Sequence, residues 1–166
     1  MTLFPEFSDS HKGSAILLSV KPKFANLIVE GSKLVELRRT VPAQVVGTIA
    51  IYSSSPVQAI VALADVKETI EASPSRLWTI AKDNGGGLTK AELIAYFESK
   101  KTGFALMLEN VRVYSRPVNP AKVFKPFSAP QSFRYLTPKE LKKLEQLLEP
   151  EVKIECHLLG GRAWCW

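Results

Sequence analysis

The 166-residue sequence is poor in cysteine and histidine and contains no long apolar run. Cys156 and Cys165 are its two cysteines, and together with His157 they lack the repeated close spacing of zinc ligands, so we expect reduced thiols and no metal site. The apolar runs, such as AILLSV (15–20), are far shorter than the roughly 18 residues of a membrane span, and no membrane partner is expected. The N-terminal residues lack a basic segment followed by an apolar one, which favours a cytoplasmic protein.

Familiar catalytic and cofactor motifs are also missing. We find no Ser-His-Asp arrangement and no paired carboxylates in the sequence. The glycine run at 85–87 lacks the preceding strand and following helix of a phosphate loop, so it is predicted to end a helix. No cofactor is expected.

Positive charge is present and unevenly distributed. The formal net charge is +6, and the segment 112–143 carries eight basic residues against one acidic residue. A second basic excess lies in 12–58. This distribution indicates either an anionic partner or a solvated basic face.

The pattern of apolar residues predicts a single domain over residues 14–166, with a helical extension at its C-terminal end, after a flexible arm at 1–13. Strands are expected at 15–20, 33–39, 46–55, 57–70, 102–115 and 152–159, with a short extended segment at 131–136. Helices are expected at 22–31, 73–87, 89–99 and 137–150, where Pro, Ser and Thr residues mark the starts. Several strands are joined by short turns and others by helices. This favours an α+β fold, a small mixed β-barrel with flanking helices, over a doubly wound parallel sheet.

The segment EGSKLVELRRT (30–40) combines the apolar spacing of a buried strand with several charges. Residues two apart on a strand share a face, so Glu36 and Arg38 point in the same direction. One interpretation is an ion pair over the barrel mouth, with Arg39 in solvent. The other makes Lys33, Glu36 and Arg38 the floor of a ligand pocket, with arginine as a forked donor to phosphate and lysine as a nucleophile or point charge.

Other residues are candidates for the edge of such a pocket. Ser53, Ser54 and Ser55 precede Pro56 and have either an ordinary turn role or a phosphate-binding one. Aromatic faces near basic residues suit single-stranded RNA, although aromatic residues on strands are more often core. The sequence offers three such aromatics, with a basic residue between the last two: Tyr52, Phe133, Arg134 and Tyr135.

Two blocks carry a resemblance to a known family. SVKPKFANLIVEGSKLVELRR (19–39), followed by IAIYSSSPVQAIVALADV (49–66), resembles the ASCH family, a branch of the PUA-like superfamily. The central motif is G-x-K-x-x-E-x-R, occupied by Gly31, Lys33, Glu36 and Arg38. TGFALMLENVRVY (102–114) and APQSFRYL (129–136) resemble later family segments, so that the likeness covers residues 14–136.

The resemblance implies a PUA-like β-barrel whose cleft binds RNA or a nucleotide-like small molecule through Lys33, Glu36, Arg38, Arg39 and the edge residues named above. It equally implies an enzymatic alternative, because some family members are acetylcytidine amidohydrolases and others are reported as ribonucleases. Lys33 and Glu36 would then be the catalytic pair. In the amidohydrolases a Thr stands in the place of Glu36, and a later Glu is catalytic; Glu92 lies in a similar part of this chain. A third alternative is a protein-binding adaptor with a vestigial pocket.

Overall fold

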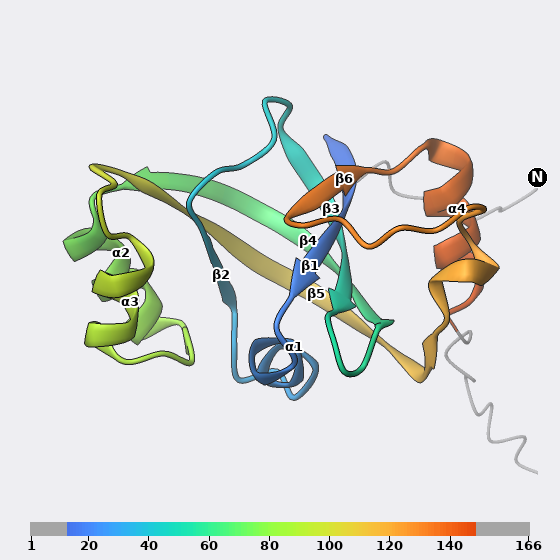
Figure 1. The fold of residues 1–166 in the computed structure, drawn as a ribbon, viewed down its shortest axis with the longest axis horizontal. Coiled ribbons are helices and arrows are strands. Elements are labelled where there is room, and N and C mark those ends of the chain that lie inside the picture. The colour runs from blue at the N-terminus through green and yellow to red at the C-terminus, as the bar shows by residue number, and fades with distance from the viewer. Residues whose placement is uncertain (1–12, 149–166) are drawn as a thin grey trace, which may run out of the picture.

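The computed structural model describes residues 13–148 as a mixed sheet with flanking helices (Figure 1). The strands are β1 (Ser14–Val20), β2 (Val35–Arg38), β3 (Val46–Ser53), β4 (Ala59–Ala72), β5 (Gly103–Val118) and β6 (Phe133–Tyr135). The helices are α1 (Pro22–Val29), α2 (Pro74–Asp83), α3 (Lys90–Tyr96) and α4 (Pro138–Gln146), with one 3-10 turn, η1 (Pro120–Lys122).

The six strands form one sheet in the order β2-β5-β4-β3-β1-β6. Only β1 and β3 pair in parallel, which requires the crossover that α1 and β2 provide between them. The long strands β4 and β5 run the length of the molecule and shift register three times, and such bulges bend and twist a strand pair (Figure 1). The expected mixed β fold with flanking helices is therefore confirmed, in the form of a curled half-barrel.

The core lies on both faces of this sheet. Ile16 of β1 packs with Ile28 of α1 on one face, while its neighbour Leu17 packs with Leu144 of α4 on the other. Burial on both faces explains why β1 and β3 read as almost continuous apolar runs. A third cluster, which includes Val35 of β2, joins the far halves of β4 and β5 to α2 and α3. The helices thus sit at separate places along the sheet, with α2 and α3 at one end and α4 at the other (Figure 1).

The helix starts were predictable because local chemistry sets them. Thr89 caps α3 and Thr137 caps α4, each in a complete capping box with the glutamate three residues later. Ser73 accepts a hydrogen bond from the backbone N–H of Arg76 at the start of α2. No helix within residues 13–148 is long and apolar enough to span a membrane.

One packing expectation is wrong, and other expectations lie outside the described residues. The leucine spacing of the last helix predicts that Leu147 faces the core, but its side chain is 40% exposed because α4 ends at Gln146 and Leu147 is the C-cap. The N-terminal arm up to residue 12, the strand expected at 152–159, and the cysteines with His157 all fall outside residues 13–148.

Candidate functional site

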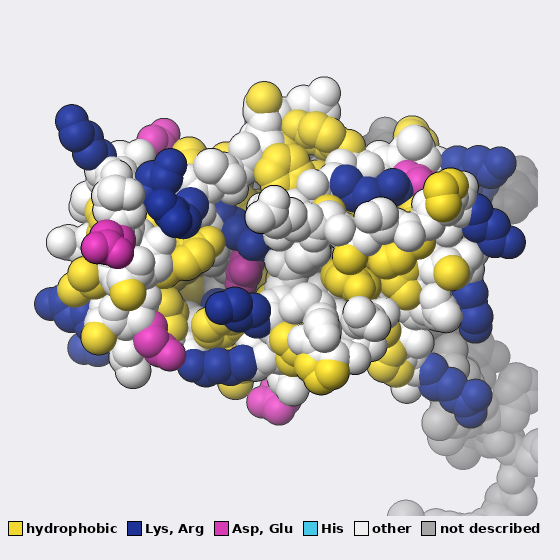
Figure 2. Space-filling view, viewed as in Figure 1, with side chains coloured by type: hydrophobic (Ala, Val, Ile, Leu, Met, Phe, Trp, Pro, Cys, Tyr) yellow, Lys and Arg dark blue, Asp and Glu magenta, His cyan; other side chains and the backbone are white. Residues whose placement is uncertain are grey.

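A cleft of about 750 Å³ opens beside α1, where several segments far apart in the sequence meet. Its walls come from the β1–α1 junction, β2, the β3–β4 turn, the glycine-containing loop before α3, α3 itself and residues 129–131. In the space-filling view this face is hollowed between α3 and β1, with a recessed acidic side chain and basic side chains around it (Figure 2). The volume is within the range of small-ligand sites.

Lys33, just before β2, and the two charged residues of β2 lie at the floor of this cleft. Lys33 and Glu36 are only 2% and 6% exposed. The Glu36 carboxylate lies between two cations, with Oε2 3.5 Å from Lys33 Nζ and Oε1 3.6 Å from Arg38 Nε. The three side chains therefore form one cluster with two positive charges and one negative charge. The cluster contains the ion pair of the first interpretation, and it lines the cleft as the second interpretation expects.

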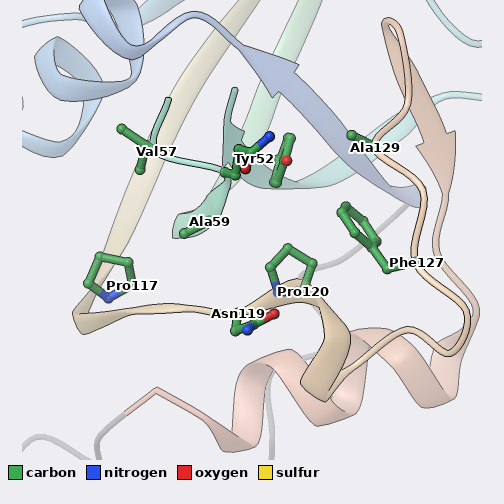
Figure 3. Close-up of a pocket in the computed structure, with 9 residues that line it drawn as sticks. Tyr52, Val57, Ala59, Pro117, Asn119, Pro120, Phe127 and Ala129 are labelled. Atoms are coloured by element: carbon green, nitrogen blue, oxygen red, sulfur yellow. The ribbon is translucent and has the colours of Figure 1, made fainter. Parts of the chain in front are cut away.

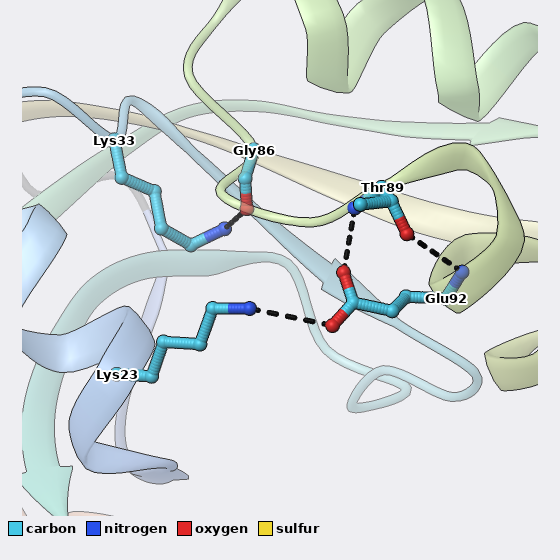
Figure 4. A network of polar contacts seen from close by, with 5 residues as sticks. All are labelled: Lys23, Lys33, Gly86, Thr89 and Glu92. Atoms are coloured by element: carbon cyan, nitrogen blue, oxygen red, sulfur yellow. Dashed lines mark hydrogen bonds and ion pairs between the residues drawn. The ribbon is translucent and has the colours of Figure 1, made fainter.

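Backbone carbonyls hold the two cations in place. Lys33 Nζ donates a hydrogen bond to the carbonyl oxygen of Gly86 at 2.8 Å (Figure 4), and Arg38 Nη2 donates to that of Ser19 at 2.6 Å. Arg38 Nε is buried and makes no hydrogen bond within residues 13–148, since its 3.6 Å contact with Glu36 is too long for one. The contact between Arg38 Nε and the Glu36 carboxylate is therefore an ion pair without a hydrogen bond.

Burial lowers the pKa of Lys33 below its ordinary value, because the ammonium ion loses water. The nearby Glu36 carboxylate opposes this shift, and the Arg38 charge adds to it. Lys33 Nζ also lies 5.1 Å from the centre of the Phe24 ring, at cation–π distance. Lys33 therefore loses its proton more easily than a surface lysine does.

A second polar network lies at the rim. Lys23 Nζ and Glu92 Oε1 are 3.4 Å apart, and Glu92 also accepts a hydrogen bond from the backbone N–H of Thr89 (Figure 4). The pKa of Glu92 is lowered, mainly by that backbone bond and further by Lys23. Glu92 therefore brings a second carboxylate to the cleft, at its rim.

Six of the predicted site residues line the cleft: Lys33, Glu36, Arg38, Tyr52, Ser54 and Ser55. The sequence could indicate them because the motif on β2 and the serine corner after β3 are local patterns.

The other predicted residues lie elsewhere. Ser53 is enclosed in the sheet at 1% exposure, and Arg39 is exposed, with Nη2 3.5 Å from the carbonyl oxygen of Glu98. On β6, Arg134 pairs with Glu140 and lies 4.3 Å from the centre of the Phe124 ring.

The two aromatics of β6 are not at the cleft either. Phe133 packs against the core cluster of β1 and α1. Tyr135 is 41% exposed, and its hydroxyl accepts a hydrogen bond from the backbone N–H of Gln44. β6 pairs with β1 at the edge of the sheet, which carries these residues away from the floor.

Sequence reasoning missed several lining residues. Lys21, Phe24 and Gln58 border the cleft, and so does Gly86, whose carbonyl receives Lys33. The glycine run ends α2 as predicted, but a helix end needs one glycine and the sequence has three. The two additional glycines could have indicated a close approach of two backbone segments. Gly85 has φ +66°, and a Cβ there would meet the carbonyl oxygen of Ser32 at 1.8 Å.

The basic segment 112–143 does not supply the charge of the cleft. None of its basic side chains lines the cleft, and Arg112 is paired with Asp65 at 2.7 Å. The positive charge there comes from Lys21, Lys33 and Arg38. Within residues 13–148, no group of three or more His, Cys, Asp or Glu side chains is placed to hold a metal ion.

The fold and the motif define the family. A family model described as "Domain of unknown function (DUF365)" matches residues 15–127, and the chain belongs to this ASCH domain (DUF365) family. The chain is 29% identical over 135 residues to an ASCH domain-containing ribonuclease from Zymomonas mobilis, an alignment that covers 79% of this chain and 90% of that protein.

Solved structures agree with this assignment. The crystal structure of ASCH from Zymomonas mobilis superposes with a TM-score of 0.74 at 27% identity, covering 82% of this chain and 96% of that one. The N-terminal domain of McrB from Staphylothermus marinus superposes with a TM-score of 0.50 at 14% identity, which shows a shared fold alone.

Proposed function

We propose that this ASCH domain binds single-stranded RNA by taking one unstacked nucleotide into the cleft. The observation that carries the proposal is the buried Lys33–Glu36–Arg38 cluster, which places net positive charge at the floor of a nucleotide-sized cavity. The similarity to an ASCH ribonuclease supports RNA as the ligand class.

The two charge types would have different tasks. The Arg38 guanidinium group at the floor and the exposed Lys21 at the rim would contact phosphate, because guanidinium and ammonium groups are the usual phosphate donors in proteins. The Glu36 carboxylate would accept a hydrogen bond from an exocyclic amine of the base, which would select bases that carry one. Binding would weaken as salt rises, since each neutralised phosphate releases counterions.

Lys21→Gln tests RNA binding without disturbing the core, because Lys21 is exposed. Binding of a fluorescent single-stranded RNA is measured by anisotropy across a salt series. We expect weaker binding and a log–log salt slope shallower by about 0.7, the value for one phosphate of a single strand. Lys67→Gln, an exposed lysine of β4 that is not part of the cleft, is the matched control. Equal losses in both variants would mean that general charge, not the cleft, holds the RNA.

A second candidate function is RNA cleavage, which the ribonuclease relative favours. In a metal-independent step the RNA 2′-hydroxyl would attack the adjacent phosphorus while Glu36 accepts its proton. The bond from phosphorus to the 5′-oxygen would break, and Lys33, whose pKa is lowered by burial, would donate its proton to that oxygen. Arg38 would stabilise the negative charge on the non-bridging oxygens of the phosphoryl group in the transition state. The products would be a 2′,3′-cyclic phosphate and a 5′-hydroxyl end.

Product analysis separates the candidates. The protein is incubated with small RNAs and with N4-acetylcytidine, and the products are identified by mass spectrometry. Cyclic-phosphate ends that disappear in Lys33→Met and Glu36→Gln, and persist in Lys67→Met and Glu68→Gln, would support cleavage. Intact RNA that is nevertheless retained would leave the binding function alone. Release of acetate without cleavage would favour the amidohydrolase chemistry, and neither product nor retention would favour an adaptor.

A further inference from the structure

A second hollow of about 520 Å³ lies next to the cleft and has no part in the function proposed above. It is bordered by the β3–β4 turn, the end of β5 and the segment 119–129 (Figure 3). Tyr52, Gln58 and Ala129 line both cavities, so they form a shared wall between them. A ligand chain that leaves the cleft over this wall enters the second hollow.

The chemistry of the second hollow differs from that of the cleft. Among residues 13–148 no charged side chain lines it, whereas the cleft is lined by lysines, an arginine and glutamates. Its surface is built from aromatic and proline rings, and Phe127 is fixed between Tyr52, edge-to-face at 5.6 Å, and Phe124, stacked at 5.6 Å. A neutral surface with rigid rings suits the face of a nucleobase and disfavours a phosphate.

Amide groups supply polar contacts at this surface. Asn119 lines the hollow, and its Oδ1 accepts the backbone N–H of Ala121 at 2.9 Å, which orients the side chain and leaves the Nδ2 donors for a base edge. Gln58, at the shared wall, brings a second amide with both a donor and an acceptor.

The backbone of Gln58 strengthens this interpretation. Gln58 has φ +53°, which lies in the left-handed region where glycine is the usual residue. Residues held in that region cluster at ligand sites, where the side chain has a use that offsets the strain. The position between two cavities gives the Gln58 side chain such a use.

We propose that the second hollow is a subsite for the base of a neighbouring nucleotide, so that the domain recognises a dinucleotide unit of single-stranded RNA. This inference rests on the proposed function: the first nucleotide occupies the charged cleft and the next base lies against Phe127. Gln58 then contacts the RNA where it crosses the wall, and selects a base edge through its amide.

The test compares three short RNAs with 2′-O-methyl sugars, which prevent attack by the 2′-oxygen. One is a dinucleotide, and the other two lack either its first or its second base. One of the two bases is the one that lies against Phe127. We expect that the RNA without this base binds about tenfold more weakly than the dinucleotide, because a stacked base contributes a factor of that order. Gln58→Gly and Phe127→Leu should each shrink this tenfold difference towards one. Phe127→Leu should do so without changing the affinity for the RNA that already lacks that base, because Phe127 lines the second hollow and not the cleft.

Gln58→Gly separates recognition from folding, because glycine adopts positive φ without strain and the variant should be at least as stable as the natural chain. Ser99→Gly is the matched control, since Ser99 has φ +63° and lines neither cavity. If all three RNAs bind equally, or if the difference persists in both variants, the second subsite is refuted while RNA binding stands. If none of the RNAs binds, the proposed function fails and this inference fails with it.

Discussion

Replacing Glu36 by glutamine removes the only carboxylate between Lys33 and Arg38 and leaves two cations buried together. Breaking a buried ion pair from one side typically destabilises a protein by about 3–5 kcal/mol. Both cations keep their backbone acceptors, Gly86 and Ser19, and glutamine keeps the shape of the side chain, so we expect a loss of about 3 kcal/mol. Urea denaturation followed by circular dichroism measures this loss, and Glu68→Gln, an exposed carboxylate of β4, should change stability by less than about 0.5 kcal/mol.

The pH dependence of the Glu36→Gln variant is a sharper test of the same reasoning. Glu36 raises the pKa of Lys33, so its removal lowers that pKa further below the unfolded value of 10.5. Between the folded and unfolded pKa values the unfolded chain binds more protons, so the stability of the folded state rises with pH there. This pH range begins lower in the variant, so the difference in stability between the variant and the unsubstituted protein should narrow as the pH rises towards 10.5. A loss no greater than that of Glu68→Gln, or a difference that widens with pH, would refute the charge cluster.

Three further variants test the scaffold around the site, each by urea denaturation. Leu63→Ala empties a fully buried position of β4 and should destabilise the protein by about 3 kcal/mol; a loss below about 1 kcal/mol would contradict the two-sided burial of the sheet. Thr137→Ala removes the α4 capping box and should lower stability by about 1 kcal/mol, and an unchanged midpoint would mean that α4 does not depend on its cap. Gly85→Ala adds a Cβ that would meet the carbonyl oxygen of Ser32 at 1.8 Å on a backbone of positive φ, so it should unfold at distinctly lower urea, and tolerance would place the loop elsewhere.

The sequence predicted the parts of the molecule that local chemistry determines. Capping boxes at Thr89 and Thr137 set helix starts, and the alternation on β2 placed Glu36 and Arg38 on one face. These features depend on neighbours within a few residues, and a periodic pattern records them.

The rest of the site depends on contacts between distant segments. Gly86 receives Lys33 from 53 residues away, and residues 129–131 close a cleft whose floor is near residue 36. No local pattern encodes such pairs. The basic run 112–143 was a poor guide for the same reason, because Arg112 and Arg134 are matched with acidic residues on other elements, Asp65 and Glu140. The second hollow also requires the fold, since Tyr52 and Phe127 lie far apart in the sequence and meet only in the folded chain.

β2 occupies one edge of the sheet and has only four residues, two of them charged and pointing inward. A strand from another molecule does not add readily to a short edge strand with inward-pointing charges, because few backbone groups are available to pair with it and the charged side chains lie beside it. The same residues that equip the cleft therefore also protect the open side of the half-barrel from edge-to-edge association. Variants that replace the cluster with apolar side chains would lose both properties together, so that we expect such variants to aggregate.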